Sequence, residues 1–483
     1  MDRESQIKIA LPKGRLLTET ASLLQESGWG ISGYHEGARY YRLKSQKIPR
    51  ISARLFHEKD IPIQIAMGNY DLGICGLDWI EELLIKYPSS ALVKVKDLGY
   101  ARSTLYMAAS SINGGSTLKG VLDRKGVIRI VSEYPNLAES FAVKSRLKWF
   151  NVFPVWGAAE VYLPENADLA LISGSKQEII DFDLIPLSEV LQSGAFLIAN
   201  KTRWETEDLN GILDSIGDRP FGGVQPCPPV DNVLKTESRR LSGSKVNPVV
   251  SGEAAEDIVW LALPDGHQQK HAINLLRKAG IKIDGYTSTG RNLRPTVNLD
   301  GVTVKVIRPQ DMPLQVANGN FDLAITGRDW LKEHLYTFPS SPVTELLDLK
   351  FGRVKIVAVV SEDTAIDDIS DLRRFSTERS VPFRVASEYV NIADMYARSN
   401  HFGMYRVVPT WGASEAFVPA DADLLIENTE TGQTLARHNL KVIDTLFEST
   451  ACLVGNTGSL SRAGKAERMK SITEILRKAV EES

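Results

Sequence analysis

The amino-acid sequence contains the same series of motifs twice, and this internal repetition constrains the fold more than any other feature. The stretch "GNYDLGICGLDWIEELL" from Gly68 returns as "GNFDLAITGRDWLKEHL" from Gly319. Four further pairs follow the same order: "ALPKGRL" and "ALPDGHQ", "SEYPNLAESFA" and "SEYVNIADMYA", "PVWGAAEVYLPENADLAL" and "PTWGASEAFVPADADLLI", "AFLIAN" and "ACLVGN". The spacing within the pairs stays between 251 and 256 residues. That period is far too long for a solenoid and indicates a duplicated, domain-sized unit.

The repeats divide the chain into a first copy (1–216), a linker (217–256) and a second copy (257–483). Pro, Gly and Ser dominate the linker, and apolar periodicity disappears there. Such composition is typical of a connecting segment. The basic stretch "KTESRRLSGSK" within it is interpreted as a solvated face of the linker.

Each copy alternates short apolar runs with segments of helical pattern, which favours an α/β fold. In the first copy we predict strands at "IKIALP", "DLGICG", "STLYMAAS", "VIRIVSE" and "ADLALIS". We predict helices there at "LLTETASLLQESG", "LDWIEELLIKY", "LAESFAVKSRLKWF" and "ETEDLNGILDSI", and a last helix of the second copy at "AGKAERMKSITEILRKAVEES". Each copy should therefore form two α/β lobes around a cleft, with ligands beyond the carboxyl ends of the strands.

Composition and charge narrow the function classes. The chain has 483 residues, 43% of them hydrophobic and 24% charged, and a net charge of −3. Near-neutral charge gives no electrostatic reason to expect nucleic-acid or membrane binding. The three cysteines are scattered, without disulfide or metal-site spacing, which fits a reducing compartment. The N-terminus has no apolar signal region, and no apolar run approaches the roughly 18 residues of a membrane span. We expect a cytoplasmic protein.

The stretch "LLIENTETGQTL" (Leu424–Leu435) carries the clearest chemical signal. A strand ends at charged residues, and a loop then opens a predicted helix, "TLARHNL". Backbone N–H groups at a helix N-terminus attract anions, hydroxyls of Thr431 and Thr434 add donors, and Gly432 allows close approach. Glu427 and Glu430 would repel a bare phosphate but would accept hydrogen bonds from sugar hydroxyls. The loop therefore suits a 5-phosphoribosyl group; the alternative is an ordinary capped turn.

Together with "RVASEYVNIADMY", "TWGASEAFVP" and "GNFDLAITGRDWL", this stretch resembles ATP phosphoribosyltransferase, the first enzyme of histidine biosynthesis. The resemblance covers nearly all of both copies and excludes the linker. Each copy matches the short form of the family, without the C-terminal regulatory domain of the long form. The resemblance implies that each copy is a two-lobed, periplasmic-binding-protein-like (type II) unit, and that the two copies form a pseudo-dimer.

The resemblance also implies a reaction and a set of site residues. N1 of the ATP adenine would attack C1 of phosphoribosyl pyrophosphate and release pyrophosphate, with Mg²⁺ present. Phosphoribosyl pyrophosphate would bind at Glu427, Glu430, Thr431, Gly432, Gln433 and Thr434, and ATP at Lys13, Asp329, Tyr389, Asn391, Gly412 and Glu415. Arg15 and Arg291 are implied catalytic residues, and Asp423 and Glu427 are implied to hold Mg²⁺ indirectly. Since Mg²⁺ usually keeps waters and substrate phosphates as ligands, no cage made of protein groups alone is expected.

The two copies have lost complementary motifs. Lys13-Gly14-Arg15 of the first copy becomes Asp265-Gly266-His267 in the second, while the phosphoribosyl loop of the second copy becomes "SGSKQEI" in the first. In the short-form family an arginine of this opening motif reaches into the neighbouring unit's site. We therefore predict one composite site, with Arg15 from the first copy and Glu427–Thr434 from the second. The alternative is that the aliphatic parts of Lys13 and Arg15 only pack at a strand end, with their charged groups in solvent, and that Asp265 caps a helix.

Other assignments also have structural alternatives. Arg291 matches Arg39 of the first copy and is expected near the pyrophosphate, but it could equally be a surface arginine. Tyr389 could pack in a core, and Asp329 could cap a helix. Short-form enzymes usually need a regulatory partner resembling histidyl-tRNA synthetase, and further oligomerisation is left open. A different class of function, a non-catalytic ligand-binding or regulatory subunit of the same fold, stays open at this point.

Overall fold

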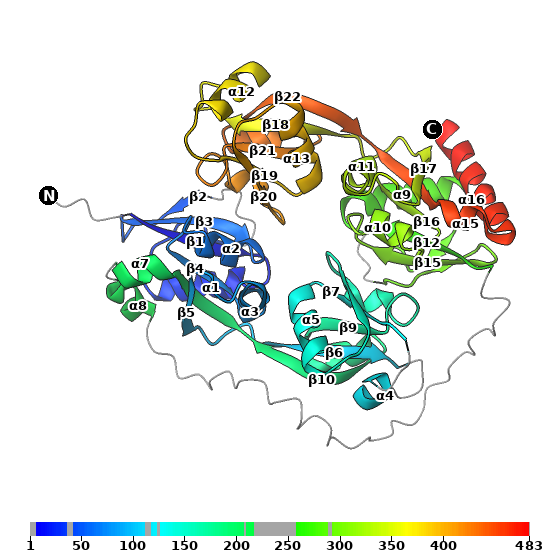
Figure 1. Ribbon diagram of the computed structural model, residues 1–483, viewed down its shortest axis with the longest axis horizontal. Coiled ribbons are helices and arrows are strands. Elements are labelled where there is room, and N and C mark those ends of the chain that lie inside the picture. The colour runs from blue at the N-terminus through cyan, green and yellow to red at the C-terminus, as the bar shows by residue number, and fades with distance from the viewer. Residues whose placement is uncertain are drawn as a thin grey trace. The chain divides into compact units, whose positions relative to one another are not determined.

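The computed structural model describes residues 6–35, 42–111, 117–122, 126–206, 209–216, 257–287 and 292–482. The predicted linker (217–256) lies outside them. The described residues divide into two compact units. Unit 1 takes those up to Pro154, those of 167–216 and Thr410–Asp421; unit 2 takes Val155–Asn166, those of 257–409 and those of 422–482. Each unit is built from two lobes, which Figure 1 labels by their elements.

The first lobe of unit 1 is a six-stranded mixed sheet in the order β2-β3-β1-β4-β11-β5. Its strands are β1 (Ile7–Lys13), β2 (Arg42–Lys44), β3 (Ile51–His57), β4 (Leu72–Gly76), β5 (Leu92–Asp97) and β11 (Ala195–Asn200). Its helices are α1 (Leu17–Glu26), α2 (Asp60–Ala66), α3 (Leu77–Lys86), α7 (Lys201–Thr206) and α8 (Asn210–Ile216). All five residues of β4 are buried, as in a parallel strand covered on both faces.

The second lobe of unit 1 is a five-stranded sheet in the order β10-β6-β9-β7-β8. Its strands are β6 (Ser103–Ser110), β7 (Ile128–Ser132), β8 (Phe150–Pro154), β9 (Leu169–Gly174) and β10 (Leu184–Ser193). Its helices are α4 (Leu118–Leu122), α5 (Pro135–Lys144) and α6 (Lys176–Asp181). The aliphatic faces of these strands and of α5 form one hydrophobic core.

The first lobe of unit 2 repeats this plan with the order β15-β12-β16-β23-β17 and a separate hairpin β13-β14. Its strands are β12 (Val259–Pro264), β13 (Ile283–Asp284), β14 (Thr296–Val297), β15 (Val302–Ile307), β16 (Leu323–Gly327), β17 (Val343–Asp348) and β23 (Ala451–Asn456). Its helices are α9 (His267–Lys278), α10 (Met312–Ala317), α11 (Arg328–Thr337), α15 (Thr457–Leu460) and α16 (Ala463–Glu481).

The second lobe of unit 2 has the strand order β20-β19-β21-β18-β22. Its strands are β18 (Val354–Ser361), β19 (Phe383–Ser387), β20 (Tyr405–Pro409), β21 (Leu424–Thr429) and β22 (Leu440–Ser449). Its helices are α12 (Ile369–Thr377), α13 (Val390–Ser399) and α14 (Gln433–Arg437). β19 pairs in parallel with β20 and β21, whereas β18 pairs antiparallel with β21 and β22.

In both units the chain crosses from the first lobe to the second and returns. β23 comes back after the second lobe and inserts antiparallel between β16 and β17, as β11 does between β4 and β5. In both units the returning strand thus lies next to the edge strand of the sheet, as in the type II arrangement of two-lobed binding folds. The predicted α/β fold class and its duplication are therefore confirmed.

Each unit includes one segment from the other half of the chain, which sequence reasoning did not foresee. The first-copy segment (Val155–Asn166, between β8 and β9) belongs to unit 2, and the second-copy segment (Thr410–Asp421, between β20 and β21) belongs to unit 1. Each contains a short 3-10 helix, Ala159–Tyr162 or Ser414–Ala416. The compact units are thus not the contiguous copies of the sequence.

Some helix predictions were too long. The helix predicted over "LAESFAVKSRLKWF" ends at Lys144, because the backbone turns left-handed at Arg146 (φ 57°) and β8 starts at Phe150. The predicted helix "ETEDLNGILDSI" is represented by α8, and α7 ends at Thr206 before it. The last helix of the second copy is confirmed as α16. Across the described parts of the chain, no helix combines the length and apolar character needed to cross a bilayer.

Candidate active site

The phosphoribosyl loop follows β21, which ends at Thr429. The backbone reverses at Gly432, whose φ of +74° strongly favours glycine, and α14 begins at the next residue. The Gly432 N–H donates to the Thr429 hydroxyl at 2.9 Å. No side chain caps α14, and Thr431, Gln433 and Thr434 are exposed around its first turn. The turn therefore presents backbone donors and hydroxyls together on one solvent-facing loop.

The corresponding loop of unit 1 is closed by its own side chains. Ser175 caps α6 by accepting from the Glu178 N–H at 3.2 Å, and the Glu178 carboxylate accepts from the Ser175 N–H at 2.6 Å. This reciprocal capping box satisfies the Ser175 and Glu178 N–H groups within the chain. The loop is also one residue shorter: β21 begins 255 residues after β9 (Leu424 and Leu169), whereas β22 begins 256 after β10 (Leu440 and Leu184). The first copy's loop therefore lacks the glycine turn, and its own side chains occupy two of its backbone donors.

A buried hydrogen-bonded chain supports the loop of unit 2. The Tyr389 hydroxyl donates to the Asp329 carboxylate at 2.6 Å and accepts from the Asn428 amide at 3.1 Å. Asp329 also accepts from the Ser449 hydroxyl at 2.9 Å. Burial raises the pKa of both Asp329 and Tyr389, while the hydrogen bonds from Tyr389 and Ser449 act to lower that of Asp329. Because Asn428 directly follows Glu427, this chain fixes the start of the loop.

The predicted ATP ligands Asp329, Tyr389 and Asn391 have structural partners in this network. Tyr389 is 1% exposed and Asp329 is 5% exposed, so both side chains face protein. The Asn391 amide donates to the Glu333 carboxylate at 2.7 Å, and that carboxylate also accepts from the Asn391 N–H at the start of α13. The burial of Tyr389 fits its alternative as a core residue, whereas Asp329 makes no side-chain cap of α11. ATP binding by the three residues stays a prediction.

Asp423 stands apart from the loop, and its predicted role in holding Mg²⁺ indirectly stays a prediction. It stands just before β21, four residues ahead of Glu427, so the two carboxylates are separated by roughly 13 Å along an extended strand. Its oxygens accept from Arg384 and pair with Arg379 at 2.8 Å. Burial raises its pKa, but these hydrogen bonds and charges outweigh burial and lower it. Asp423 is therefore held between two arginines.

Three predicted site residues meet in one cavity of unit 1. Lys13, Arg15 and Gly412 line a cavity of about 400 Å³. Its other lining residues are Gly14, His57, Glu58, Lys59, Trp79, Glu133, Tyr134 and Ala413. Sequence reasoning missed Lys59 and Trp79, whose ammonium and ring lie 4.7 Å apart in a cation–π contact. The cavity is built from both copies, because Gly412 and Ala413 belong to the second-copy segment.

Arg15 is held at this cavity by two carboxylates. Its guanidinium lies 2.7 Å from Asp78 and 3.0 Å from Glu58, and its side chain is 38% exposed. Burial lowers the pKa of Arg15, but the charges of Asp78 and Glu58 more than compensate, so that the group stays protonated. Burial and the neighbouring cations lower the pKa of His57 to about 4, so His57 is neutral near pH 7. The guanidinium is thus oriented while part of it faces solvent.

Glu58 should make the stability of unit 1 depend on pH. Burial, opposed by Arg15, raises its pKa from 4.5 to about 7. Between these values the folded chain retains a proton that the unfolded chain has released, so the free energy of unfolding falls as pH rises through this window. We expect a loss of about 1–3 kcal/mol. Thermal unfolding of the wild type and Glu58→Gln at about pH 5 and about pH 8 measures it. A stability difference between the two proteins that does not change with pH would contradict this.

Three further predicted site residues are Arg291, Gly412 and Glu415. Arg291 and its counterpart Arg39 lie outside the described residues. Gly412 and Glu415 belong to unit 1, whereas the loop belongs to unit 2. Their first-copy counterparts, Gly157 and Glu160, are the ones that belong to unit 2. Sequence reasoning assigned Gly412 and Glu415 to the second copy's site because they share its sequence copy, and that assignment stays a prediction.

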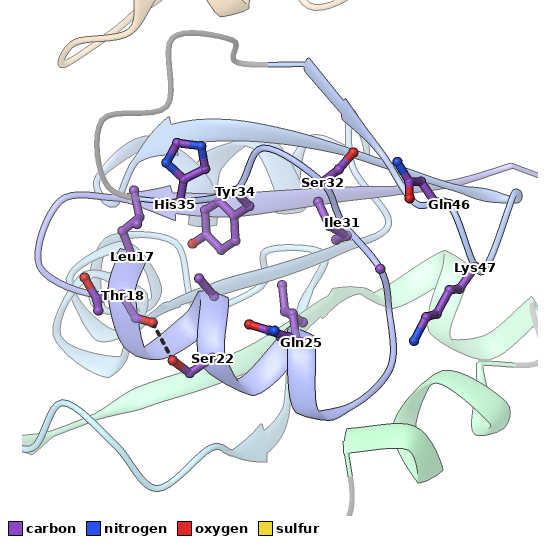
Figure 2. A pocket seen from close by; sticks show the side chains of 13 residues that line it. Leu17, Thr18, Ser22, Gln25, Ile31, Ser32, Tyr34, His35, Gln46 and Lys47 are labelled. Atoms are coloured by element: carbon purple, nitrogen blue, oxygen red, sulfur yellow. Dashed lines mark hydrogen bonds between the residues drawn. The ribbon is translucent and has the colours of Figure 1, made fainter.

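A second cavity of unit 1, of about 470 Å³, contains none of the predicted site residues. Figure 2 shows it between α1 and the segment around Ile31 and Tyr34, with Thr18, Ser22 and Gln25 on the helix side. The Ser22 hydroxyl donates to the Thr18 carbonyl at 3.2 Å, which satisfies it within the helix. Among the described residues that line this cavity there is no carboxylate, and the basic ones are Lys47 and His35.

Comparison with known proteins establishes the family. The family model for HisG, ATP phosphoribosyltransferase, matches residues 57–218 and again 308–478. The chain belongs to the ATP phosphoribosyltransferase family. It is therefore an enzyme of the pentosyltransferase class, and the two matches confirm the tandem duplication.

Individual relatives match about half of the chain. An ATP phosphoribosyltransferase of Prosthecochloris aestuarii is 30% identical over 47% of this chain and 73% of the relative. One from Solibacter usitatus is 32% identical over 46% of this chain and 73% of the relative. Among solved structures, the ATP phosphoribosyl transferase (HisG:HisZ) complex from Thermotoga maritima matches 47% of this chain with 22% identity and a TM-score of 0.38.

Proposed function

We propose that the chain condenses ATP with phosphoribosyl pyrophosphate to form phosphoribosyl-ATP and pyrophosphate, the first step of histidine biosynthesis. Family membership supports the reaction. The observation that carries the site is the contrast between the two loops: the turn at Gly432 has an uncapped helix start with exposed hydroxyls, whereas Ser175 and Glu178 close the other. One loop of the two is therefore proposed to bind phosphoribosyl pyrophosphate.

Different residues of the loop would bind different parts of phosphoribosyl pyrophosphate. The 5-phosphate would accept from backbone N–H groups at Gln433 and Thr434 and from the hydroxyls of Thr431 and Thr434. Glu427 and Glu430 would accept hydrogen bonds from the ribose hydroxyls. Held at both ends, the ribose is oriented for attack at C1, which lowers the barrier by positioning rather than by covalent chemistry.

We propose that Mg²⁺ accompanies the pyrophosphate group. The parts of the chain that the structure describes contain no group of three or more His, Cys, Asp and Glu able to hold a metal ion. We propose that the ion is carried mainly by substrate phosphates and water, with Glu427 holding it indirectly. Bound Mg²⁺ would neutralise the leaving pyrophosphate.

We propose that Arg15 supplies positive charge to the transfer, and that Lys13 contacts ATP. Replacing Arg15 by alanine should lower kcat by about tenfold or more, because developing charge on the leaving group loses a preorganised cation. Steady-state kinetics with both substrates measures this. Arg102→Ala, which removes an arginine paired with Asp97 on the surface of the same unit, is the control. An Arg15→Ala variant as active as the control would remove Arg15 from the mechanism.

A regulatory partner is part of the proposal. The Thermotoga maritima structure is described as a HisG:HisZ complex, and we propose that a partner of that kind, resembling histidyl-tRNA synthetase, binds this chain in the cytoplasm.

The deciding experiment is phosphoribosyl-ATP formation by the purified chain with ATP, phosphoribosyl pyrophosphate and Mg²⁺, followed by absorbance or mass spectrometry. Turnover supports the proposal. If the chain alone forms no phosphoribosyl-ATP, the assay is repeated with a regulatory partner. Absence of product under both conditions would reject the proposed function.

A further inference from the structure

We propose that the first-copy segment is part of the second copy's active site, where Trp156 acts as a positioning residue for the phosphoribosyl loop. This inference rests on the proposed function. It differs from the sequence prediction, because the contribution of the first copy is a backbone segment seated within unit 2 and does not depend on Arg15.

A buried charge cluster anchors the end of the segment. Lys305 on β15 is completely buried, and its ammonium donates to Glu165 at 2.9 Å and to Asn166 at 2.7 Å. Burial lowers the pKa of Lys305 to about 8 despite the charge of Glu165. A buried ammonium needs such partners, because an unpaired charge in a protein interior is costly. The segment is therefore required by the lobe into which it docks.

Further contacts hold the middle and the start of the segment. Arg294 pairs with Glu165 at 2.9 Å and donates to the Val161 carbonyl at 2.9 Å. At the other end, the Trp156 N–H donates to the Asp311 carboxylate at 3.0 Å. Both ends and the centre of the segment are thus fixed to unit 2, which leaves little freedom for the residues between them.

A continuous series of contacts leads from the segment to the loop. The Trp156 ring meets the Trp330 ring edge-on with centroids 5.8 Å apart, and Trp330 lies against Tyr389 at 4.4 Å. Tyr389 in turn accepts from the Asn428 amide, directly after Glu427. Such aromatic pairs stabilise each other's position beyond the effect of their buried area. Displacing Trp156 should therefore loosen the support of the loop.

The internal symmetry supports the same conclusion. In unit 1, Gly412 and Ala413 of the second-copy segment line the cavity beside Trp79 and Tyr134. Trp79 and Tyr134 stack at 4.3 Å, as Trp330 and Tyr389 do in unit 2. Ala158 and Ala413 share the same left-handed backbone, each with φ of 54°. By this correspondence, the Gly157–Ala158 turn lies at the wall of the unit 2 site.

This arrangement gives the first copy a function although its own loop is closed. Without Val155–Asn166, unit 2 would expose Lys305 and lose the ring that supports Trp330. The first copy is therefore needed by the second as a supplier of one wall of its site.

The test compares Trp156→Leu with Trp411→Leu, the same change at the matching position of the second-copy segment. We expect Trp156→Leu to raise KM for phosphoribosyl pyrophosphate about tenfold with a smaller change in kcat, because small displacements of positioning groups have large kinetic effects. Trp156→Phe should restore most of the loss. Trp411→Leu should change KM less than about twofold, since Trp411 belongs to unit 1. The proposal would be overturned if Trp411→Leu raised KM for phosphoribosyl pyrophosphate as much as Trp156→Leu, or more.

Hydrogen–deuterium exchange separates this inference from the proposed function. Lys305→Met removes the buried charge at nearly constant side-chain length, and should speed exchange of the 155–166 amides about tenfold or more. Arg54→Met, which breaks the matching 3.1 Å contact with Asp421, should speed exchange in 410–421 instead. Unchanged exchange of 155–166 in Lys305→Met would refute the docking of the segment. If the wild type shows no transferase activity, the proposed function fails while this exchange result still stands.

Discussion

Replacing Thr431 by alanine is expected to lower kcat/KM for phosphoribosyl pyrophosphate by about 10²–10³-fold, the loss typical of removing one preorganised donor to a charged group. Thr431 is exposed at the turn that precedes Gly432, and no side chain competes with a ligand for the start of α14. Its hydroxyl is therefore free to serve the substrate phosphate. Steady-state kinetics with phosphoribosyl pyrophosphate varied at saturating ATP measures the change.

Ser175→Ala in the first copy is the matched control. Ser175 caps α6 within a reciprocal pair, so its loss should cost about 1 kcal/mol of local stability and leave the kinetics nearly unchanged. Equal kinetic losses in the two variants would mean that both loops bind substrate. A loss confined to Ser175→Ala would reverse the assignment of the live copy.

The sequence allowed the duplication, the α/β class and the loop to be predicted, because all three depend on local patterns. β21 and β9 are short apolar runs, and the glycine turn at Gly432 needs a residue that adopts positive φ. Even here the local signal was incomplete. Sequence alone did not show that Ser175 and Glu178 close the first loop with a capping box, although the Ser-x-x-Glu spacing could have indicated it.

The exchange of segments could not be predicted, because it depends on contacts between residues more than a hundred positions apart. Lys305 and Glu165 are separated by 140 residues, and Arg54 and Asp421 by 367. From the sequence alone, Lys305 would be taken for a surface cation on β15. Its burial can be explained only in the folded structure, where Glu165 and Asn166 lie beside it. The same limit applies to Gly412 and Glu415, which share the second copy's sequence with the loop although the structure places them in unit 1.

The two copies also differ in how their cores are fixed, which leads to the prediction with the largest expected effect on stability. In unit 2, Asp322 is 2% exposed and accepts from Lys465 at 2.9 Å, from Ser459 at 2.5 Å and from the Trp260 N–H at 2.8 Å. Asp322→Ala leaves the largely buried Lys465 ammonium without its partner. We expect a loss of about 3–5 kcal/mol. Denaturant unfolding measures it, and hydrogen exchange should show α16, which carries Lys465, opening first.

Asp71 is the matched residue of unit 1 and provides the control. It accepts from the Lys8 N–H at 2.8 Å, as Asp322 does from Trp260, but its side-chain cation is Arg203, which is 44% exposed. An exposed arginine regains water when its partner is removed, so Asp71→Ala should cost only about 1–2 kcal/mol. Equal losses in the free energy of unfolding would show that the backbone hydrogen bond common to both sites contributes most of the stabilisation. A larger loss for Asp322→Ala would show that the buried ammonium makes α16 depend on this one carboxylate.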